Sequence, residues 1–354
     1  MLRLLLLCSL LSAAEPRHVT VYREQGRFGG WPANHGIWSW DNEILVGFSA
    51  AWFQATTDDR HAMDRSKPEE PRLARSMDGG ESWKVETPPS LLPPEQGGKQ
   101  PVELKEPMDF TATGFAMTLR FTNVNTGPSL LYYSKDRGKT WLGPYHFPLF
   151  GQKGIAARTD YIVNGKRDCH VFLTASKANG REGRPLVVRT TDGGLTWNFI
   201  SWIGVEPKGF AIMPSSVRID RNTLLTAVRH KEVSANTIDV YRSPDNGENW
   251  SLLNKPANTG KSSGNPPSLI QLKDGRLVLA YGYRDVPYGI RARVSKDRGV
   301  SWGDEIVLRN DGAFWDVGYP RSVQRADGKV VTVYYFADDR NKERYIGATI
   351  WEPQ

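Results

Sequence analysis

The stretch that decides the fold is "SMDGGESW", residues 76–83. Its pattern, Ser/Thr-x-Asp-x-Gly-x-x-Trp, returns as "SKDRGKTW" (134–141), "TTDGGLTW" (190–197), "SPDNGENW" (243–250) and "SKDRGVSW" (295–302). The starts of successive copies are separated by 58, 56, 53 and 52 residues. Such even spacing is typical of a repeat protein in which each copy belongs to one structural unit. We call the eight-residue pattern the box.

Each box lies between two runs that favour β-strands, such as "PLVVRT" before the third copy. The Asp and Ser/Thr side chains of a box can bond to the N–H groups of a turn, and its Gly can adopt a positive φ. The Trp is expected to pack as an aromatic anchor between neighbouring sheets. The box is therefore predicted to be a hairpin turn with its own internal hydrogen bonds.

Two further strands joined by a tight turn are predicted upstream of the box, as in "SLIQLKDGRLVLAYGY" (268–283). Four strands in a unit of this length are typical of a propeller blade. After the fifth boxed unit the C-terminal segment supplies three more strands without a box, and "HVTVYRE" (18–24) supplies the fourth. The sequence predicts an all-β fold, a six-bladed β-propeller whose N-terminal strand closes the last blade.

The N-terminus has the pattern of a secretory signal peptide. Arg3 precedes an apolar run from Leu4 to Leu11, and small residues follow up to Ala14. We expect residues 1–14 to be the signal peptide and residues 15–354 a single propeller domain. The apolar run is too short to span a bilayer and no other segment approaches that length. The expected product is secreted, extracellular or periplasmic, without a membrane span, and a monomer.

Charge and rare residues narrow the classes of partner. The net charge of +7 with a pI near 9.3 favours an anionic partner. Basic residues are scattered rather than clustered, which argues against nucleic acid and leaves an acidic carbohydrate. Cys169 would be the lone thiol of the mature chain, and its apolar neighbours predict a buried core residue rather than a nucleophile. No His pair has metal-ligand spacing, so neither a metal nor a cofactor is predicted.

Five boxes at blade spacing behind a signal peptide resemble the Asp-box (BNR) propellers of the sialidase (neuraminidase) superfamily. The resemblance covers nearly all of the mature chain. It implies an exo-glycosidase whose substrate is a glycan with a terminal acidic sugar, sialic acid or a uronate. In that superfamily the boxes lie on outer turns, away from the central pocket, so the site must consist of residues outside the repeat.

The family holds the substrate carboxylate with three arginines, since guanidinium forks match a carboxylate, and attacks with a Tyr activated by a Glu. By order and strand position, the resemblance places the substrate-binding arginines at Arg27, Arg229 and Arg291, with Arg284 and Arg293 as rivals of the third and Arg321 as a further member. It places the nucleophile at Tyr319. Inter-blade or surface ion pairs are the alternative reading for each arginine.

The family's acid/base is a loop Asp, which points to Asp59 or Asp64 in "TTDDRHAMDRSKPEEP" (56–71), a polar loop that is otherwise simply solvated. One departure stands out. Where the activating Glu is expected, "FAIMPSSVR" (210–218) has Met213. Without that base Tyr319 is a poor nucleophile, so a non-catalytic carbohydrate-binding propeller is an alternative.

A second alternative comes from "RFGGWPANHGIWSW" (27–40), rich in Gly and aromatic residues. Trp31 offers a sugar-stacking face, and His35 is suited to acid/base chemistry near neutral pH. The stretch resembles the first blade of rhamnosidase-like and lyase-like propellers that cut rhamnose–uronate linkages, which implies a catalytic role for His35. The competing interpretation is a hydrogen-bonded His in a turn.

Overall fold

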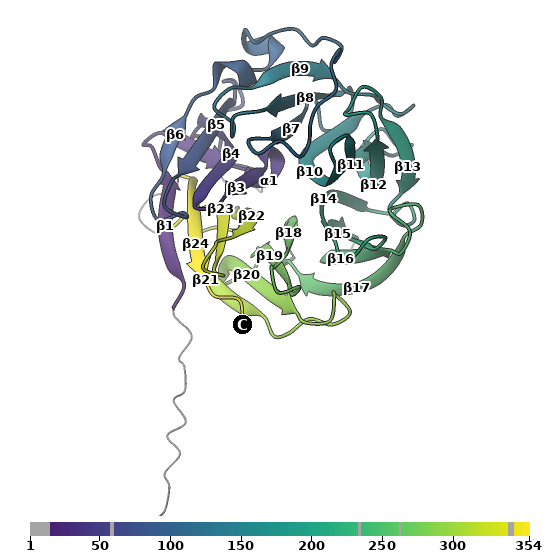
Figure 1. The fold of residues 1–354 in the computed structure, drawn as a ribbon. Helices are drawn as coiled ribbons and strands as arrows, with labels where there is room; N and C mark the ends of the chain where they lie inside the picture. Colours follow the sequence, from purple (N-terminus) through teal and green to yellow (C-terminus); the bar gives the residue numbers. More distant parts are fainter. Residues whose placement is uncertain (1–14, 57–59, 233–234, 262, 339–342) are drawn as a thin grey trace, which may run out of the picture.

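Strands make up nearly all regular structure of the described residues, and their sheets are arranged around a common centre (Figure 1). The computed structural model describes residues 15–56, 60–232, 235–261, 263–338 and 343–354. The predicted signal peptide, 1–14, lies outside this range. The described helical segments are short, namely α1 (Pro32–His35), η1 (Pro89–Leu91) and η2 (Pro94–Gln96). The all-β prediction is confirmed.

The first two sheets come from residues 27–202. One contains β2 (Arg27–Gly30), β3 (Ile37–Trp40), β4 (Glu43–Trp52), β5 (Glu70–Ser76) and β6 (Lys84–Glu86). The next has seven strands in the order β13-β12-β11-β10-β7-β8-β9. These are β7 (Ala116–Phe121), β8 (Ser129–Ser134), β9 (Leu142–His146), β10 (Ile155–Gly165), β11 (Asp168–Ser176), β12 (Glu182–Thr190) and β13 (Asn198–Trp202).

Three four-stranded sheets follow. The first contains β14 (Phe210–Arg218), β15 (Leu224–Lys231), β16 (Asn236–Ser243) and β17 (Ser251–Asn258). The second contains β18 (Pro267–Gln271), β19 (Leu277–Tyr283), β20 (Tyr288–Ser295) and β21 (Ile306–Gly312). The third joins both ends of the chain in the order β1-β24-β23-β22, with β1 (Arg17–Tyr22), β22 (Gly318–Gln324), β23 (Val330–Phe336) and β24 (Tyr345–Trp351).

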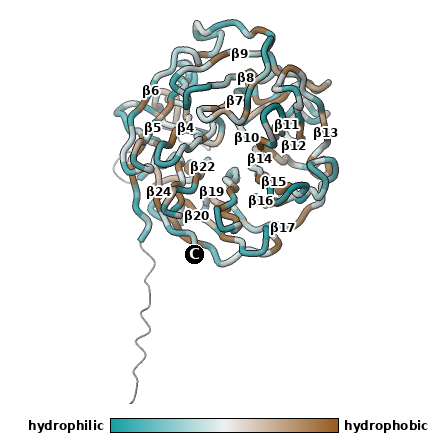
Figure 2. The backbone as a smooth tube through the Cα atoms, viewed as in Figure 1, coloured by the Kyte–Doolittle hydropathy of each residue, from teal (hydrophilic) through white to brown (hydrophobic). Residues whose placement is uncertain are grey.

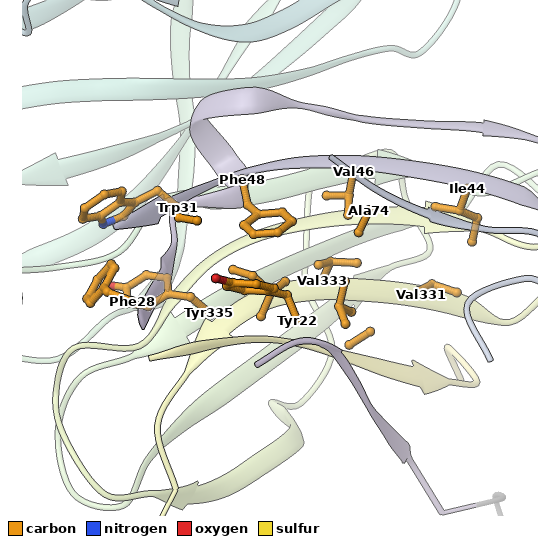
Figure 3. Close-up of a cluster of buried hydrophobic side chains, with 14 of the residues drawn as sticks. Tyr22, Phe28, Trp31, Ile44, Val46, Phe48, Ala74, Val331, Val333 and Tyr335 are labelled. Atoms are coloured by element: carbon orange, nitrogen blue, oxygen red, sulfur yellow. The ribbon is translucent and has the colours of Figure 1, made fainter. Parts of the chain in front are cut away.

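The N-terminal strand pairs with the C-terminal one, as the sequence predicts. β1 runs antiparallel to β24, with Arg17 opposite Ile350. Figure 3 shows the apolar cluster between this sheet and the first sheet, in which Tyr22 and Val333 meet Phe48 and Val46. All four side chains are buried. Burial of apolar surface thus holds the two ends of the chain together and removes an open sheet edge.

The five boxes repeat one hydrogen-bond pattern, between β5 and β6 and at the matching turns β8–β9, β12–β13, β16–β17 and β20–β21. In the first box, Ser76 Oγ accepts from the buried N–H of Gly80 at 2.7 Å and donates to Asp78 at 2.8 Å. Asp78 also accepts from the N–H of Ser82 at 2.9 Å. The internally bonded hairpin is confirmed.

Box glycines and tryptophans tie neighbouring sheets together. Gly138 has φ 75°, and a Cβ there would collide with Leu45 of the preceding sheet, so only glycine fits. Each box Trp packs against a core cluster, and four of the five clusters are shared by two sheets; Trp141, for example, lies with Leu45 and Tyr132. The aromatic anchor is therefore confirmed.

The second boxed unit departs from the four-strand expectation, because its described residues supply only β7, β8 and β9. The segment before β7, residues 87–115, is rich in proline; it forms the short 3-10 helices η1 and η2 and a single bridge from Val102 to Tyr145 of β9, but no strand. Proline has no N–H to donate to a strand ladder. The free edge of β7 pairs instead with β10, through Arg120 and Arg158.

Hydrophobic residues are spread around all the sheets rather than gathered in one layer (Figure 2). Cys169 lies in this core, fully buried, as predicted. Among the described residues no helix has the length and hydropathy needed to cross a bilayer.

Candidate active site

Three innermost strands share one backbone irregularity near the centre. β10, β14 and β22 each break register, and a residue with positive φ lies in each break: Thr159 (21°), Met213 (58°) and Tyr319 (50°). Figure 1 shows these strands facing the centre. Strained backbone at equivalent positions is a feature of functional sites, where it re-aims side chains. The side chains around Tyr319 are therefore candidates for a functional site.

Arg229, on β15, meets Tyr319 across two sheets. Its Nη1 donates to the Tyr319 hydroxyl at 3.0 Å, and its Nη2 donates to Ser263. The side chain is buried, and no described residue accepts a hydrogen bond from its Nε. No carboxylate of the described residues forms an ion pair with this guanidinium. Burial lowers the pKa of Arg229, and the nearby charge of Arg284 lowers it further. A buried cation without a counter-ion is costly, so this position favours an anionic ligand.

Arg284 follows β19 and lies beside the same tyrosine. Its guanidinium carbon is 5.6 Å from the Tyr319 ring centre and 5.0 Å from that of Trp315. Its nitrogens donate to the carbonyls of Val317 (3.1 Å) and Gly264 (2.9 Å). These contacts hold the plane of the guanidinium in one orientation. Arg229 and Arg284 together place two cations around one phenol.

A buried acid–histidine pair lies next to Arg284. Asp316 is fully buried and accepts from His61 Nδ1 at 2.8 Å. Its oxygens also lie 3.6 Å from Arg284 and 3.4 Å from Arg344. Burial alone would raise the pKa of Asp316, but His61 and the two arginines lower it to about 2. The carboxylate is therefore charged and fixes the orientation of the imidazole.

His61 is the residue of this centre that sequence reasoning missed. It comes from the loop between β4 and β5, where Asp59 and Asp64 were favoured as acid/base. Its ring packs edge-on against Trp31 at 5.0 Å and lies 6.5 Å from Tyr335, whose own ring is 5.7 Å from Tyr319. Trp31 thus belongs to the wall of the centre. His61 is recognised as a candidate through its contact with Asp316. The two residues are 255 positions apart, and the sequence gives no signal of that contact.

The remaining predicted residues lie in other surroundings. Arg27 pairs with Glu70 at 3.0 Å and lies over Trp52. Arg291, on β20, donates to the carbonyls of Arg309 and Pro287, and its Nε lies 3.3 Å from Glu305. Neither Arg27 nor Arg291 therefore forms a hydrogen bond with Tyr319.

Arg321, the further member, is buried between sheets. Its Nη2 donates to the carbonyls of Ala33, Arg158 and Thr159. The rival Arg293 donates to the carbonyl of Gly303, behind the fifth box. Of the predicted arginines, Arg229 and Arg284 are the two that contact Tyr319.

The loop acids have contrasting positions. Asp64 accepts from the N–H and hydroxyl of Ser66 and lies 3.6 Å from Lys67, so its bonds stay within its own loop. Asp59 lies outside the described residues and stays a prediction. Where the activating Glu was expected, Met213 is buried, and its N–H donates to Thr174.

His35 ends α1 and lines a cavity of about 410 Å³ with Asn34, Ser49 and Arg120. Its Nε2 lies 3.0 Å from Ser49 Oγ, and its Nδ1 is buried without a partner. Burial, with the charges of Arg120 and Arg321, lowers the pKa of His35 well below its ordinary value. The imidazole is neutral at neutral pH, which suits a base or hydrogen-bond donor better than an acid.

A metal centre has no support in the part of the chain that the structure describes, where no group of three His, Cys, Asp or Glu side chains could hold an ion. The chemistry available from the described side chains consists of anion binding by Arg229 and Arg284, a phenol at Tyr319, and a histidine oriented by a carboxylate.

Comparisons with known proteins agree with this architecture. The family model described as "BNR repeat-like domain" matches residues 48–332. A search of curated proteins gives no match. A Dyadobacter fermentans protein of unknown function is similar in structure, with TM-score 0.74 at 21% identity, over 97% of this chain and 99% of that one.

Two glycosidases also share the fold. The sialidase of Trypanosoma rangeli has TM-score 0.64 at 13% identity, with 96% of this chain matched to 60% of that one. The α-L-arabinofuranosidase of Fusarium graminearum has TM-score 0.62 at 13% identity, with 95% and 97% matched. At these identities the likeness concerns the fold alone.

Proposed function

The chain belongs to the family of BNR repeat-like domains and has the fold of the sialidase superfamily, and we propose that it is a sialidase-like glycoside hydrolase acting on a terminal acidic sugar. The observation that carries this proposal is the contact of Arg229 with Tyr319 beside Arg284. A carboxylate bound by the two guanidinium groups would give Arg229 the counter-ion it lacks. Sialic acid or a uronate supplies that carboxylate.

The neighbouring groups suit the two roles that a substitution at the anomeric carbon requires, attack on that carbon and protonation of the leaving oxygen. Tyr319 is the nucleophile: its hydroxyl proton leaves to solvent before the attack, and the N–H that Arg229 donates to its oxygen stabilises the phenolate in place of the missing Glu. His61, held by Asp316, gives its proton to the departing oxygen. Water then cleaves the glycosyl–tyrosine bond and restores both groups.

The proposal includes the finer architecture of six blades. The seven-stranded sheet divides at its single β7–β10 residue pair, Arg120 with Arg158, into a three-stranded and a four-stranded unit. With the other four sheets this gives six units around the centre (Figure 1). Secretion, inferred from the N-terminal apolar run, completes the proposal.

The carboxylate contact is tested with fluorogenic α-sialosides and β-glucuronides and the variant Arg229→Met. Loss of a charged hydrogen-bonding fork removes about 1.5–3 kcal/mol, so kcat/KM should fall about 10- to 150-fold. Arg221→Met, which changes an exposed arginine, is the matched control. Equal rates in both variants would refute the assignment of Arg229.

Catalysis by Tyr319 and His61 is tested by Tyr319→Phe and His61→Gln, with Tyr288→Phe as control. The first should lower kcat on the order of a thousandfold or more. The second should lower kcat about 100-fold for a poor leaving group and much less for an activated phenol, which needs no proton. If Tyr319→Phe keeps full kcat, Tyr319 is not the nucleophile.

A second candidate function is cleavage of a rhamnose–uronate linkage with His35 as base. It is favoured by the position of His35 in the wall of the 410 Å³ cavity. His35→Ala would then abolish activity while Tyr319→Phe leaves it nearly intact, and elimination would yield an unsaturated product that absorbs in the ultraviolet. If acidic glycans bind to the protein but no substrate is cleaved, the chain is a carbohydrate-binding propeller, as the absence of the activating Glu suggests.

A further inference from the structure

The cavity beside α1 contains a cation that the proposed reaction leaves unused. Its walls come from α1, the loop after β4, the η1–η2 segment and β7. Its volume of about 410 Å³ falls within the range of about 300–1,000 Å³ that is usual for small-ligand sites. Arg120, on β7, lies in its wall.

Arg120 has no partner for part of its guanidinium group. Its Nε and Nη2 are buried, and no described residue accepts a hydrogen bond from them. Glu69 and Glu95 also line the cavity, but neither forms an ion pair with Arg120. Burial lowers the pKa of Arg120 to about 10, and the phenol of Tyr132 is the single neighbour that opposes this effect.

Two buried arginines of this chain contrast with the half-buried Arg120. Arg158, the residue paired with it in the sheet, forms a two-point contact with Glu182. Arg75 bonds to Glu43 at 2.6 Å and to Glu86 at 2.7 Å. A buried guanidinium normally has such a counter-ion, because desolvation of an unpaired charge costs free energy. The unpaired donors of Arg120 therefore favour an anionic group that enters the cavity.

The rest of the wall suits a sugar ring. The half-buried Phe121 offers apolar ring surface, and Asn34 and Ser49 offer groups that bond to hydroxyls. The unpartnered Nδ1 of His35 adds a further polar atom in the same wall. A sugar with one oxyanion substituent would satisfy both kinds of surface.

The cavity adjoins the centre described above. Asn34 lies in the cavity wall, and its neighbour Ala33 in α1 belongs to the apolar cluster against which Tyr319 packs. Met63, also in the wall, lies two residues from His61 in the same loop. A ligand in the cavity and a sugar at Arg229 would therefore be neighbours.

We propose that Arg120 forms a second anion subsite, which binds the carboxylate or sulfate of the sugar next to the one held by Arg229. The substrate class becomes an acidic oligosaccharide with acidic groups on two sugars. This description of the substrate rests on the proposed function, whereas anion binding at Arg120 does not. The subsite takes a monosaccharide acid on its own.

The test is titration calorimetry with D-glucuronate, inorganic sulfate and, as neutral match, D-glucose. The protein should bind glucuronate at two classes of site. It should bind glucose much more weakly than glucuronate at both. Arg120→Met should remove one class, with at least a tenfold loss of affinity there. Arg120→Lys keeps the charge but not the fork, and should weaken that class less. Arg229→Met should remove the other class.

The outcomes separate the two proposals. If Arg120→Met keeps both classes, or if glucose competes as well as glucuronate, the subsite is refuted while Arg229 is untouched. If Arg120→Met removes one class and Arg229→Met removes none, the subsite stands and the proposed function fails. Should the Arg120 variants not fold, hydrogen exchange on the unmodified protein decides. Glucuronate should then protect residues 63–71 and 116–122, and lack of protection there overturns the subsite.

Discussion

At the scale of single residues, the buried carboxylate of Asp316 holds the candidate active site together. It contacts His61, Arg284, Arg344 and Tyr335 at once. Three of these partners, His61, Arg284 and Arg344, can carry positive charge. Asp316 itself is fully buried. The orientation of the catalytic candidates thus depends on one charge.

Asp316→Asn should destabilise the protein strongly, because it leaves two arginines and a histidine around a neutral amide. Breaking a buried ionic network in this way costs about 3–5 kcal/mol. The measurement is the free energy of unfolding in urea at pH 7. Asp311→Asn, at a partly exposed pair with Arg309, should cost about 1 kcal/mol or less. Equal losses in the two variants would contradict the role of Asp316.

At the scale of the element, the box hairpin consists of contacts made within eight residues. Ser76 satisfies the buried N–H of Gly80, whereas Ser82 bonds to Asp78 at the surface. The same division recurs in the other boxes, for example at Thr190 with Gly194 and Asp192 with Thr196. The hydroxyl of the first box residue therefore contributes more to the stability of the fold than the exposed hydroxyl near the end of the box.

Ser76→Ala should cost about 1–3 kcal/mol, since it leaves a buried donor without an acceptor. Ser82→Ala, in the same turn, removes only exposed bonds and should cost well under 1 kcal/mol. Both are compared by urea denaturation with the unaltered chain. A larger loss for Ser82→Ala than for Ser76→Ala would reverse the assigned roles.

At the scale of the whole molecule, the box aspartates make the ring sensitive to acid. Hydrogen bonds from Ser82 outweigh burial and lower the pKa of Asp78 to about 2, and the pKa of Asp136, Asp192, Asp245 and Asp297 is lowered in the same way. A carboxyl whose folded pKa is depressed stabilises the protein above its unfolded pKa and loses that effect as pH falls.

The thermal midpoint should therefore stay nearly constant down to about pH 4 and drop steeply from pH 4 to pH 2. Replacing Asp78 by Asn removes one titrating group and should make this drop shallower, at the cost of lower stability at pH 7. A midpoint that is unchanged between pH 4 and pH 2 would contradict the shared acid sensitivity.

The pairing of the two chain ends depends on β1. Val21 and Tyr22 are buried against the first sheet, and β1 covers the edge of β24. A chain that starts at residue 23 should lose several kcal/mol of apolar burial and expose a strand edge, which promotes aggregation. A chain that starts at residue 15 is the control in light scattering and thermal unfolding. Equal solubility and midpoint in the two chains would show that closure contributes little.

The sequence by itself determined the repeat, the box, the all-β fold and the pairing of the two chain ends. The physical reason is that a box is satisfied locally: Ser76, Asp78, Gly80 and Ser82 bond to one another within one turn. Alternating apolar strands on either side then leave few ways to pack. The three-stranded second unit is the exception, because a proline-rich segment replaces the first strand.

Only the tertiary structure decided which side chains meet at the centre. Arg229 and Tyr319 are 90 positions apart, and His61 and Asp316 are 255 apart. Their contacts depend on strained inner strands and on loops outside the repeat. From strand order alone, Arg27 and Arg291 were predicted to bind substrate together with Arg229. The lack of a counter-ion for Arg120 among the described residues is likewise a property of its surroundings, which only the folded chain shows.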